Sequence, residues 1–225
     1  MNDWGIIGIG RIGLSMARNM SDKGISLSIY DKAFENKLDP IFEEKNLYPE
    51  LKKVYVFNDI LNFIESIERP RKILILVPSG NPNEQVISKL ITLLNENDII
   101  IDAGNTNPLI SYSNKLKIAK NNILYLGIGV SGGTQGVLEG PSIMIGGDNI
   151  AFKKVKDEGL TKALSDRDSK WTTATSGDWS DSVLLWTRAS GSTPSPSTGP
   201  SQAQDELYYI YVETSGSSSS DEAEL

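Results

Sequence analysis

The sequence contains neither cysteine nor histidine among its 225 residues. Without cysteine there is no disulfide framework and no thiolate chemistry. Without histidine the commonest general base near neutral pH and the commonest metal ligand are both missing, so we expect no metal site. No apolar run is long enough to span a bilayer, and the N-terminus lacks the basic and apolar regions of a signal peptide. We therefore expect a cytoplasmic protein with no membrane association.

Positive charge is also not in excess in either of the two parts of the chain. Residues 1–158 contain 18 Lys and Arg against 19 Asp and Glu, whereas residues 159–225 contain 4 against 10. The net charge of −7 therefore comes mainly from the C-terminal part. A basic nucleic-acid footprint is absent, and we expect no nucleic-acid partner.

Residues 1–156 have the pattern of an α/β domain, in which short runs of Ile, Leu and Val alternate with segments of helical periodicity. The expected strands are Trp4–Ile9, Ser26–Tyr30, Val54–Phe57, Lys72–Val77, Asp98–Asp102 and Ile123–Gly127. The expected helices are Ile12–Lys23, Ile60–Ile67, Pro82–Asn95 and Leu109–Ala119. This alternation predicts a Rossmann-like, doubly wound parallel sheet with helices on both faces.

Residues 157–225 have a different character, with 23 Ser and Thr in the 67 positions from 159 onward. Such low-complexity, acidic text predicts a mostly irregular tail rather than a complete domain. Only Ser182–Arg188 and Leu207–Thr214 have the pattern of strands, and two isolated strands do not make a domain. Residues 175–190 weakly resemble the opening of the N-terminal β-domain of PhoD-type alkaline phosphatases.

The best-defined motif stands between the first expected strand and the first expected helix. It consists of Gly8, Ile9, Gly10, Arg11, Ile12 and Gly13. In dinucleotide-binding domains the first glycine makes a tight turn, the second admits the pyrophosphate, and the third allows helix and strand to pack. The pyrophosphate then lies on the helix N-terminus, where the free amides favour an anion.

The cofactor preference depends on the end of the second expected strand. Asp31 stands there, where an acidic residue bonds the adenosine ribose and repels a 2′-phosphate. The motif therefore favours NAD over NADP, although Lys32 weakens the preference.

Two further strand ends carry residues that belong to the same edge of a parallel sheet, where ligands bind. Val77, Pro78 and Ser79 are expected beside the nicotinamide half of the cofactor, and Asn105 follows a strand that we expect to be fully buried. The glycine-rich stretch over residues 129–147 indicates that something approaches the backbone closely there.

Four segments occur in a characteristic order: GIIGIGRIGLSMARNM, ERPRKILILVPSG, IIIDAGNT and GVSGGTQGVLEGPSIMIGG. Together they resemble the N-terminal NAD(P)-binding domain of 6-phosphogluconate dehydrogenase, over residues 3–155. The resemblance implies oxidative decarboxylation of 6-phosphogluconate to ribulose 5-phosphate with NAD(P), in the pentose phosphate pathway. It implies that the sugar acid contacts Asn105, Ser131, Gly132 and Gly133, and that Asn105 also contacts the nicotinamide.

The sequence departs from the family pattern at a few positions, with Thr134 and Gln135 where acidic residues are usual and Ile145 where proline is usual. The resemblance also implies a catalytic lysine and glutamate on a large helical domain that forms the family's homodimer. No such stretch follows residue 156, so we assign no catalytic residue and expect a truncated or chimeric chain. Two alternatives remain: a non-catalytic dinucleotide-binding module, and another β-hydroxyacid dehydrogenase.

Overall fold

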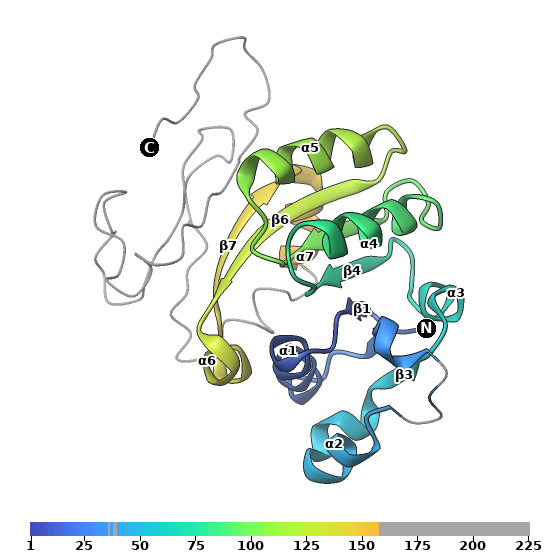
Figure 1. The fold of residues 1–225 in the computed structure, drawn as a ribbon, viewed down its shortest axis with the longest axis vertical. Coiled ribbons are helices and arrows are strands. Elements are labelled where there is room, and N and C mark those ends of the chain that lie inside the picture. Colours follow the sequence, from blue (N-terminus) through green and yellow to red (C-terminus); the bar gives the residue numbers. More distant parts are fainter. Residues whose placement is uncertain (36, 38–39, 158–225) are drawn as a thin grey trace, which may run out of the picture.

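A computed structural model describes residues 1–35, 37 and 40–157 of the chain (Figure 1). Its strands are β1 (Trp4–Ile7), β2 (Leu27–Tyr30), β3 (Tyr55–Phe57), β4 (Lys72–Ile75), β5 (Ile99–Asp102), β6 (Leu124–Ser131) and β7 (Ser142–Gly147). The helices are α1 (Arg11–Asp22), α2 (Phe42–Leu47), α3 (Ile60–Glu65), α4 (Asn81–Ile91), α5 (Pro108–Ala119), α6 (Gly133–Glu139) and α7 (Asn149–Asp157). Two short 3-10 helices, η1 (Lys32–Phe34) and η2 (Pro49–Lys53), complete these elements.

The strands form one sheet in the order β3-β2-β1-β4-β5-β6-β7. All neighbouring pairs are parallel except β6 and β7. The chain moves outward from β1 to β3 and then crosses back to β4, which pairs with β1 on its other side. This reversal creates a crevice beyond the carboxyl ends of β1 and β4, where ligands of such sheets bind.

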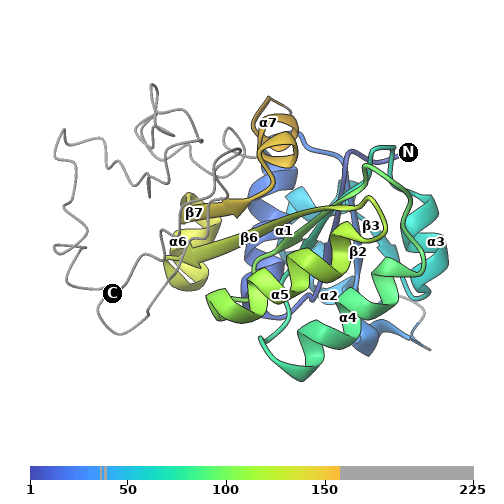
Figure 2. The same cartoon turned by 90° about the horizontal axis from the view of Figure 1, so that it is seen from above.

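Both faces of the sheet are covered because alternate strand residues point to opposite sides. Ile6, Leu74 and Ile101 belong to one core cluster, which also contains buried residues of α1, α6 and α7. Ile7 and Ile75 belong to the second cluster, with buried residues of α3, α4 and α5. Figure 2 shows α4 and α5 together on one side of the sheet and α7 on the other.

The predicted α/β architecture is confirmed; the differences lie at the ends of elements and in α2, α6 and β7, which we did not predict. β1 and β4 end at Ile7 and Ile75, earlier than expected, because the following residues leave the sheet as loops. β6 runs on to Ser131 and pairs with β7, an antiparallel edge strand that we did not predict. Across the described residues, no helix combines the length and apolar character needed to cross a lipid bilayer.

The remaining predictions concern residues 158–225. The strands expected at Ser182–Arg188 and Leu207–Thr214, and the resemblance over residues 175–190, lie outside the described residues.

Candidate functional site

Two glycines of the loop after β1 are required by the packing of the protein itself. Gly8 is buried with a φ of +94°, and a Cβ added there would lie 2.6 Å from the carbonyl oxygen of Leu76. A Cβ added at Gly13 would overlap the carbonyl oxygen of Gly8. Any side chain at either position therefore pushes the loop away from α1 or from β4.

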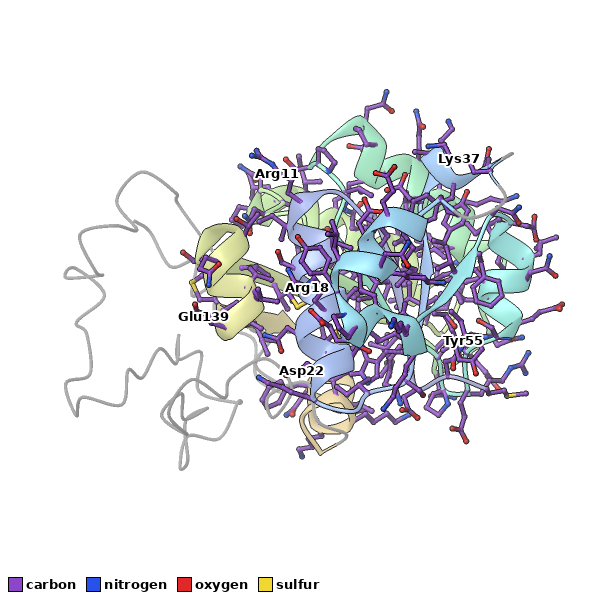
Figure 3. All side chains as sticks on the ribbon, turned by 90° about the horizontal axis from the view of Figure 1, so that it is seen from below. Arg11, Arg18, Asp22, Lys37, Tyr55 and Glu139 are labelled. Atoms are coloured by element: carbon purple, nitrogen blue, oxygen red, sulfur yellow. The ribbon has the colours of Figure 1, made fainter. Side chains whose placement is uncertain are left out.

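Gly10 differs from these two glycines. It is exposed, its φ of −76° suits any residue, and a Cβ added there would meet no atom within 4 Å. It precedes α1 as an N-cap without a side-chain hydrogen bond, and the first turn of α1 contains no acidic residue. The unpaired amides of this turn and the helix dipole favour an anion. Figure 3 shows Arg11 at this end of α1.

Asp31 joins the loop after β2 to the glycine loop. Its Oδ2 accepts a hydrogen bond from the Ile9 amide at 2.7 Å, and its Oδ1 accepts one from the Ala33 amide at 2.8 Å. Each carboxylate oxygen has capacity for a further donor. Lys32, the first residue of η1, is exposed.

This corner of the edge carries further negative charge. The Tyr30 hydroxyl donates to Glu35 Oε1 at 2.7 Å. Burial raises the pKa of Tyr30, and the hydrogen bond to Glu35 and the charges of Glu35 and Asp31 raise it further. The hydroxyl therefore stays protonated, and the two carboxylates make this corner electronegative.

The loop after β4 lies between the loops after β1 and β5. A Cβ added at Gly8 would lie 2.8 Å from Val77 Cγ1, and one added at Gly104 would lie 2.6 Å from the Val77 carbonyl oxygen. Pro78 and Ser79 are exposed, and α4 begins soon after them. The predicted nicotinamide-side residues therefore line the same edge as the glycine loop.

Asn105 is exposed after β5 and has a φ of +53°. Its Oδ1 accepts a hydrogen bond from the Val130 amide at 3.0 Å. Because the oxygen makes this bond, the side chain offers its Nδ2 group as a donor toward other partners. The bond also brings Asn105 next to Ser131, the last residue of β6.

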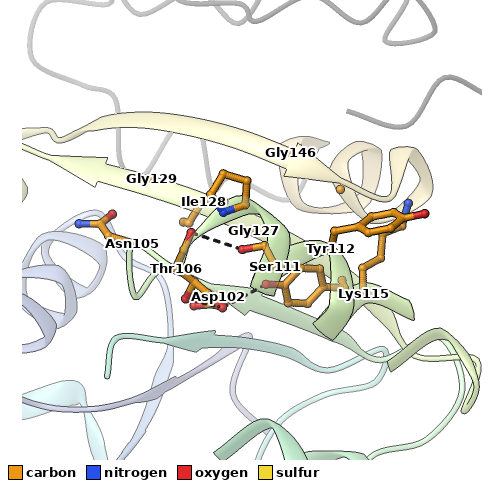
Figure 4. Close-up of a pocket in the computed structure, with 13 residues that line it drawn as sticks. Asp102, Asn105, Thr106, Ser111, Tyr112, Lys115, Gly127, Ile128, Gly129 and Gly146 are labelled. Carbon is orange, nitrogen blue, oxygen red and sulfur yellow. Dashed lines mark hydrogen bonds between the residues drawn. The ribbon is translucent and has the colours of Figure 1, made fainter. Parts of the chain in front are cut away.

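The buried carboxylate of Asp102 holds the loop that carries Asn105, and Figure 4 shows this region. Oδ1 accepts hydrogen bonds from Asn83 Nδ2 at 2.8 Å and from the Gly104 amide at 3.0 Å. Oδ2 accepts bonds from Thr106 Oγ1 at 2.9 Å and from the Tyr125 hydroxyl at 3.0 Å. Burial, followed by the charge of Asp102, raises the pKa of Tyr125, so this hydroxyl remains a donor.

The sequence reasoning missed Asn83 and Tyr125. A faint signal existed for both, because Asn83 is a polar residue on the buried side of α4 and Tyr125 interrupts an otherwise aliphatic strand. Neither signal names the partner, which depends on the tertiary structure.

Ser131, Gly132 and Gly133 form the connection from β6 to α6. Gly132 has a φ of +128°, and both glycines are exposed. Helix α6 packs beside α1 (Figure 3), and the Asn19 side chain of α1 donates to the Val137 carbonyl oxygen at 2.7 Å. The three predicted substrate residues therefore lead into α6, and α6 packs against α1, the helix that begins at the glycine loop.

Part of the glycine-rich stretch has an explanation inside the sheet. Gly147 ends β7, and a Cβ added there would overlap the carbonyl oxygen of Tyr125 on β6. The close approach that the sequence indicated at this position is made by a neighbouring strand.

A small pocket of about 30 Å³ lies between α5 and the β6–β7 pair (Figure 4). Its lining includes Asp102, Thr106, Tyr112, Lys115 and Tyr125. Its volume suffices for about one or two water molecules and not for a sugar acid or a nucleotide.

The lysines that follow the site occupy ordinary surface positions where they are described. Lys153 is exposed on α7, whose Phe152 and Val155 are buried in the core. Lys162 and Lys170 lie outside the described residues.

Comparisons with known proteins show the family of the chain. A family model described as the NAD binding domain of 6-phosphogluconate dehydrogenase matches residues 3–163. The decarboxylating 6-phosphogluconate dehydrogenase of Staphylococcus epidermidis is 37% identical over 153 residues, which cover 68% of this chain and 32% of that protein. The decarboxylating 6-phosphogluconate dehydrogenase 2 of Arabidopsis thaliana is 37% identical over 165 residues, covering 73% and 34%.

Solved structures give the same picture. The 6-phosphogluconate dehydrogenase of Plasmodium falciparum, studied with its cofactor NADP+ and its substrate 6-phosphogluconate, matches with a TM-score of 0.65 and 30% identity. The match covers 74% of this chain and 35% of that one. The 3-hydroxyisobutyrate dehydrogenase of Mycobacterium tuberculosis has a TM-score of 0.60 at 16% identity, over 73% and 52%, and shares the fold. The chain spans about a third of the length of the curated relatives it matches.

Proposed function

Because the chain belongs to the 6-phosphogluconate dehydrogenase family, we propose that it binds a nicotinamide dinucleotide and presents it to 6-phosphogluconate. In the whole protein this site serves the oxidative decarboxylation of the sugar acid. Gly10 is the observation that carries the proposal. Neither its conformation nor its surroundings require a glycine, so a ligand that approaches the backbone accounts for it.

The residues present fit the dinucleotide. The amides at the start of α1 receive the pyrophosphate, with Arg11 beside them, and Asp31 accepts hydrogen bonds from the adenosine ribose. Val77, Pro78 and Ser79 flank the nicotinamide half. When bound, the cofactor supplies a hydride acceptor.

We propose NAD as the preferred cofactor. Asp31 and Glu35 place two carboxylates at the ribose end, and a 2′-phosphate there meets like charge. Lys32 is exposed and offsets part of this repulsion.

The substrate side consists of Asn105, Ser131, Gly132 and Gly133. The Asn105 Nδ2 group donates to the sugar acid and to the nicotinamide carboxamide, while the serine hydroxyl and the exposed glycine amides bind the hydroxyls and carboxylate. We assign no general acid or base within this chain, because the family resemblance places both roles on a helical domain rather than on the dinucleotide-binding domain.

A second candidate function is a dinucleotide-binding module without turnover. It is favoured by the features that fit a dinucleotide alone, the start of α1 and the Asp31 carboxylate. A third candidate, another β-hydroxyacid dehydrogenase, has weaker support, because the segments Asp102–Asn105 and Gly140–Ser142 follow the 6-phosphogluconate dehydrogenase pattern.

A paired measurement on the purified chain tests these candidates. NAD and NADP are titrated by calorimetry, and 6-phosphogluconate is then added while reduced nicotinamide is followed by absorbance. We expect NAD to bind and no reduced cofactor to form. Absence of binding by either dinucleotide contradicts the proposal, whereas turnover shows that a lysine or glutamate of this chain acts in the chemistry.

A further inference from the structure

Asp102 connects three elements beside the proposed site: α4, β6 and the loop after β5. Asn83 reaches it from the first turn of α4, which follows the nicotinamide-side loop after β4. Tyr125 reaches it from β6, the strand that ends at Ser131. Gly104 and Thr106 bond it from the loop after β5.

We propose that Asp102, held by Asn83 and Tyr125, is a positioning residue that aims Asn105 at the nicotinamide and the substrate. The inference rests on the proposed function, because Asn105 has a role in binding only if a dinucleotide occupies the crevice.

The two neighbours of Asn105 are held by one buried side chain. Gly104 and Thr106 are both bonded to the Asp102 carboxylate, through a backbone amide and a side-chain hydroxyl respectively. Asn105 stands between them with a φ of +53°, in the left-handed region that Asn adopts more readily than most residues. Asp102 therefore fixes the backbone from which the Asn105 side chain projects, and the Val130 amide holds the side-chain oxygen.

The hydrogen bonds to the Asp102 carboxylate hold the loop after β5 strongly. Asp102 is 1% exposed and receives four hydrogen bonds from uncharged donors. A buried carboxylate binds its donors strongly because no water replaces a lost partner. Removing one donor leaves the buried carboxylate short of a partner, so the carboxylate shifts and the loop bonded to it moves at its exposed tip.

The hydroxyl of Tyr125 can be tested separately from the support that its ring gives to the fold. Tyr125 is 2% exposed, so the loss of its ring must lower stability whatever its hydroxyl does. Tyr125→Phe keeps the ring and removes the hydroxyl that donates to Asp102 and also interacts with Ser111 and Asn114. Its effect on ligands then reports on the aim of Asn105 rather than on the core.

The experiment compares a complete dinucleotide with a fragment that lacks the nicotinamide. Dissociation constants for NADH and for ADP-ribose are measured by calorimetry on the full chain and on Tyr125→Phe. We expect NADH to bind about three- to tenfold more weakly to the variant and ADP-ribose to bind unchanged. Tyr55→Phe, which alters an exposed hydroxyl on β3, is the matched control and should leave both constants unchanged.

A double-mutant cycle assigns the loss to Asn105. Asn105→Ala should weaken NADH binding to a similar degree, and adding Tyr125→Phe to it should cause no further loss. Equal losses for NADH and ADP-ribose, or additive losses in the double variant, overturn the positioning role. If Asn105→Ala leaves NADH binding intact, the proposed role of Asn105 fails instead.

A second pair of variants keeps the test independent of Tyr125. Thr106→Val removes another donor to Asp102, whereas Thr106→Ser retains the hydroxyl. We expect weaker NADH binding in the first and recovery in the second, each with unchanged ADP-ribose binding. A loss in both variants, or in neither, contradicts the inference.

Discussion

The glycines after β1 and the glycines of β7 look alike in the sequence and differ in what approaches them. At Gly147 the approaching atom is the carbonyl oxygen of Tyr125, a part of the protein. At Gly10 no atom of residues 1–35, 37 and 40–157 lies within 4 Å of an added Cβ. The difference teaches that a bare backbone becomes a sign of a ligand only when the fold itself leaves the space open.

The same division runs inside the first loop. Gly8 and Gly13 are buried against the protein, whereas Gly10 is exposed between them. One motif therefore contains two kinds of glycine, and substitutions should separate stability from binding.

The largest effect is expected at Gly13. Gly13→Ala places a methyl group over the carbonyl oxygen of Gly8, where neither backbone segment can yield easily. We expect a loss of about 3 kcal/mol in the free energy of unfolding, from overpacking. Chemical denaturation measures it. A variant as stable as the parent contradicts the packing described here.

A smaller loss is expected at Gly147, in the region where the fold explains the glycine. Gly147→Ala meets both the Tyr125 carbonyl and a φ of +133°, which alanine tolerates poorly. We expect a loss of about 2 kcal/mol in the free energy of unfolding. The affinity of the folded protein for NAD should stay unchanged, as titration below the melting temperature can check. A selective loss of affinity instead places a ligand at β7.

The opposite result is expected at Gly10. Gly10→Ala fits the backbone and should raise the free energy of unfolding by about 0.4–1 kcal/mol, because the unfolded chain loses freedom. Its methyl group occupies the space proposed for the pyrophosphate, so NAD affinity should fall by about tenfold or more. Denaturation and calorimetry on one preparation test both halves. Unchanged affinity shows that the pyrophosphate lies elsewhere.

Some elements of the fold could be predicted from the sequence and others could not. The strands β1, β4 and β5 were predictable because parallel strands buried on both faces are nearly continuous apolar runs. The pattern of β7 is weaker, since two of its six residues are glycines and it is recognised as a strand only by its pairing with β6. Helix α6 is short and polar, so its sequence shows no helical periodicity.

The candidate site divides in a similar way. The glycine loop, Asp31 and Asn105 follow strand ends, and the topology of a parallel sheet brings strand ends together. The bonds from Asn83 and Tyr125 to Asp102 were not predictable, because they join residues 19 and 23 positions away from the aspartate. Their geometry depends on how α4 and β6 pack around β5.

Alkaline pH provides a test on the protein-facing side of the comparison. The raised pKa of Tyr125 means that the unfolded chain loses this proton above about pH 10 while the folded chain keeps it. The contribution of the protonated Tyr125 hydroxyl to the free energy of unfolding is therefore complete below about pH 10. Above that pH it declines by up to about 1.4 kcal/mol per pH unit. Tyr125→Phe should have a shallower decline than the parent in denaturation curves at increasing pH. Parallel declines contradict a protonated, buried hydroxyl.

The smallest effect is expected at the ribose end of the ligand-facing side. Asp31→Asn removes one charge and keeps an oxygen that can accept the Ile9 amide, while the bond from the Ala33 amide is lost. We expect the ratio of NADP to NAD affinity to rise about fivefold, because a 2′-phosphate no longer meets the Asp31 carboxylate while Glu35 remains. Lys32→Ala should move the ratio the other way by a smaller factor, since its ammonium group is exposed and screened by salt. Because both substitutions leave Gly8 and Gly13 untouched, thermal stability should hardly change. A shift in stability without a shift in the affinity ratio means that Asp31 serves the loop alone, and that the glycine loop carries the whole of the dinucleotide recognition.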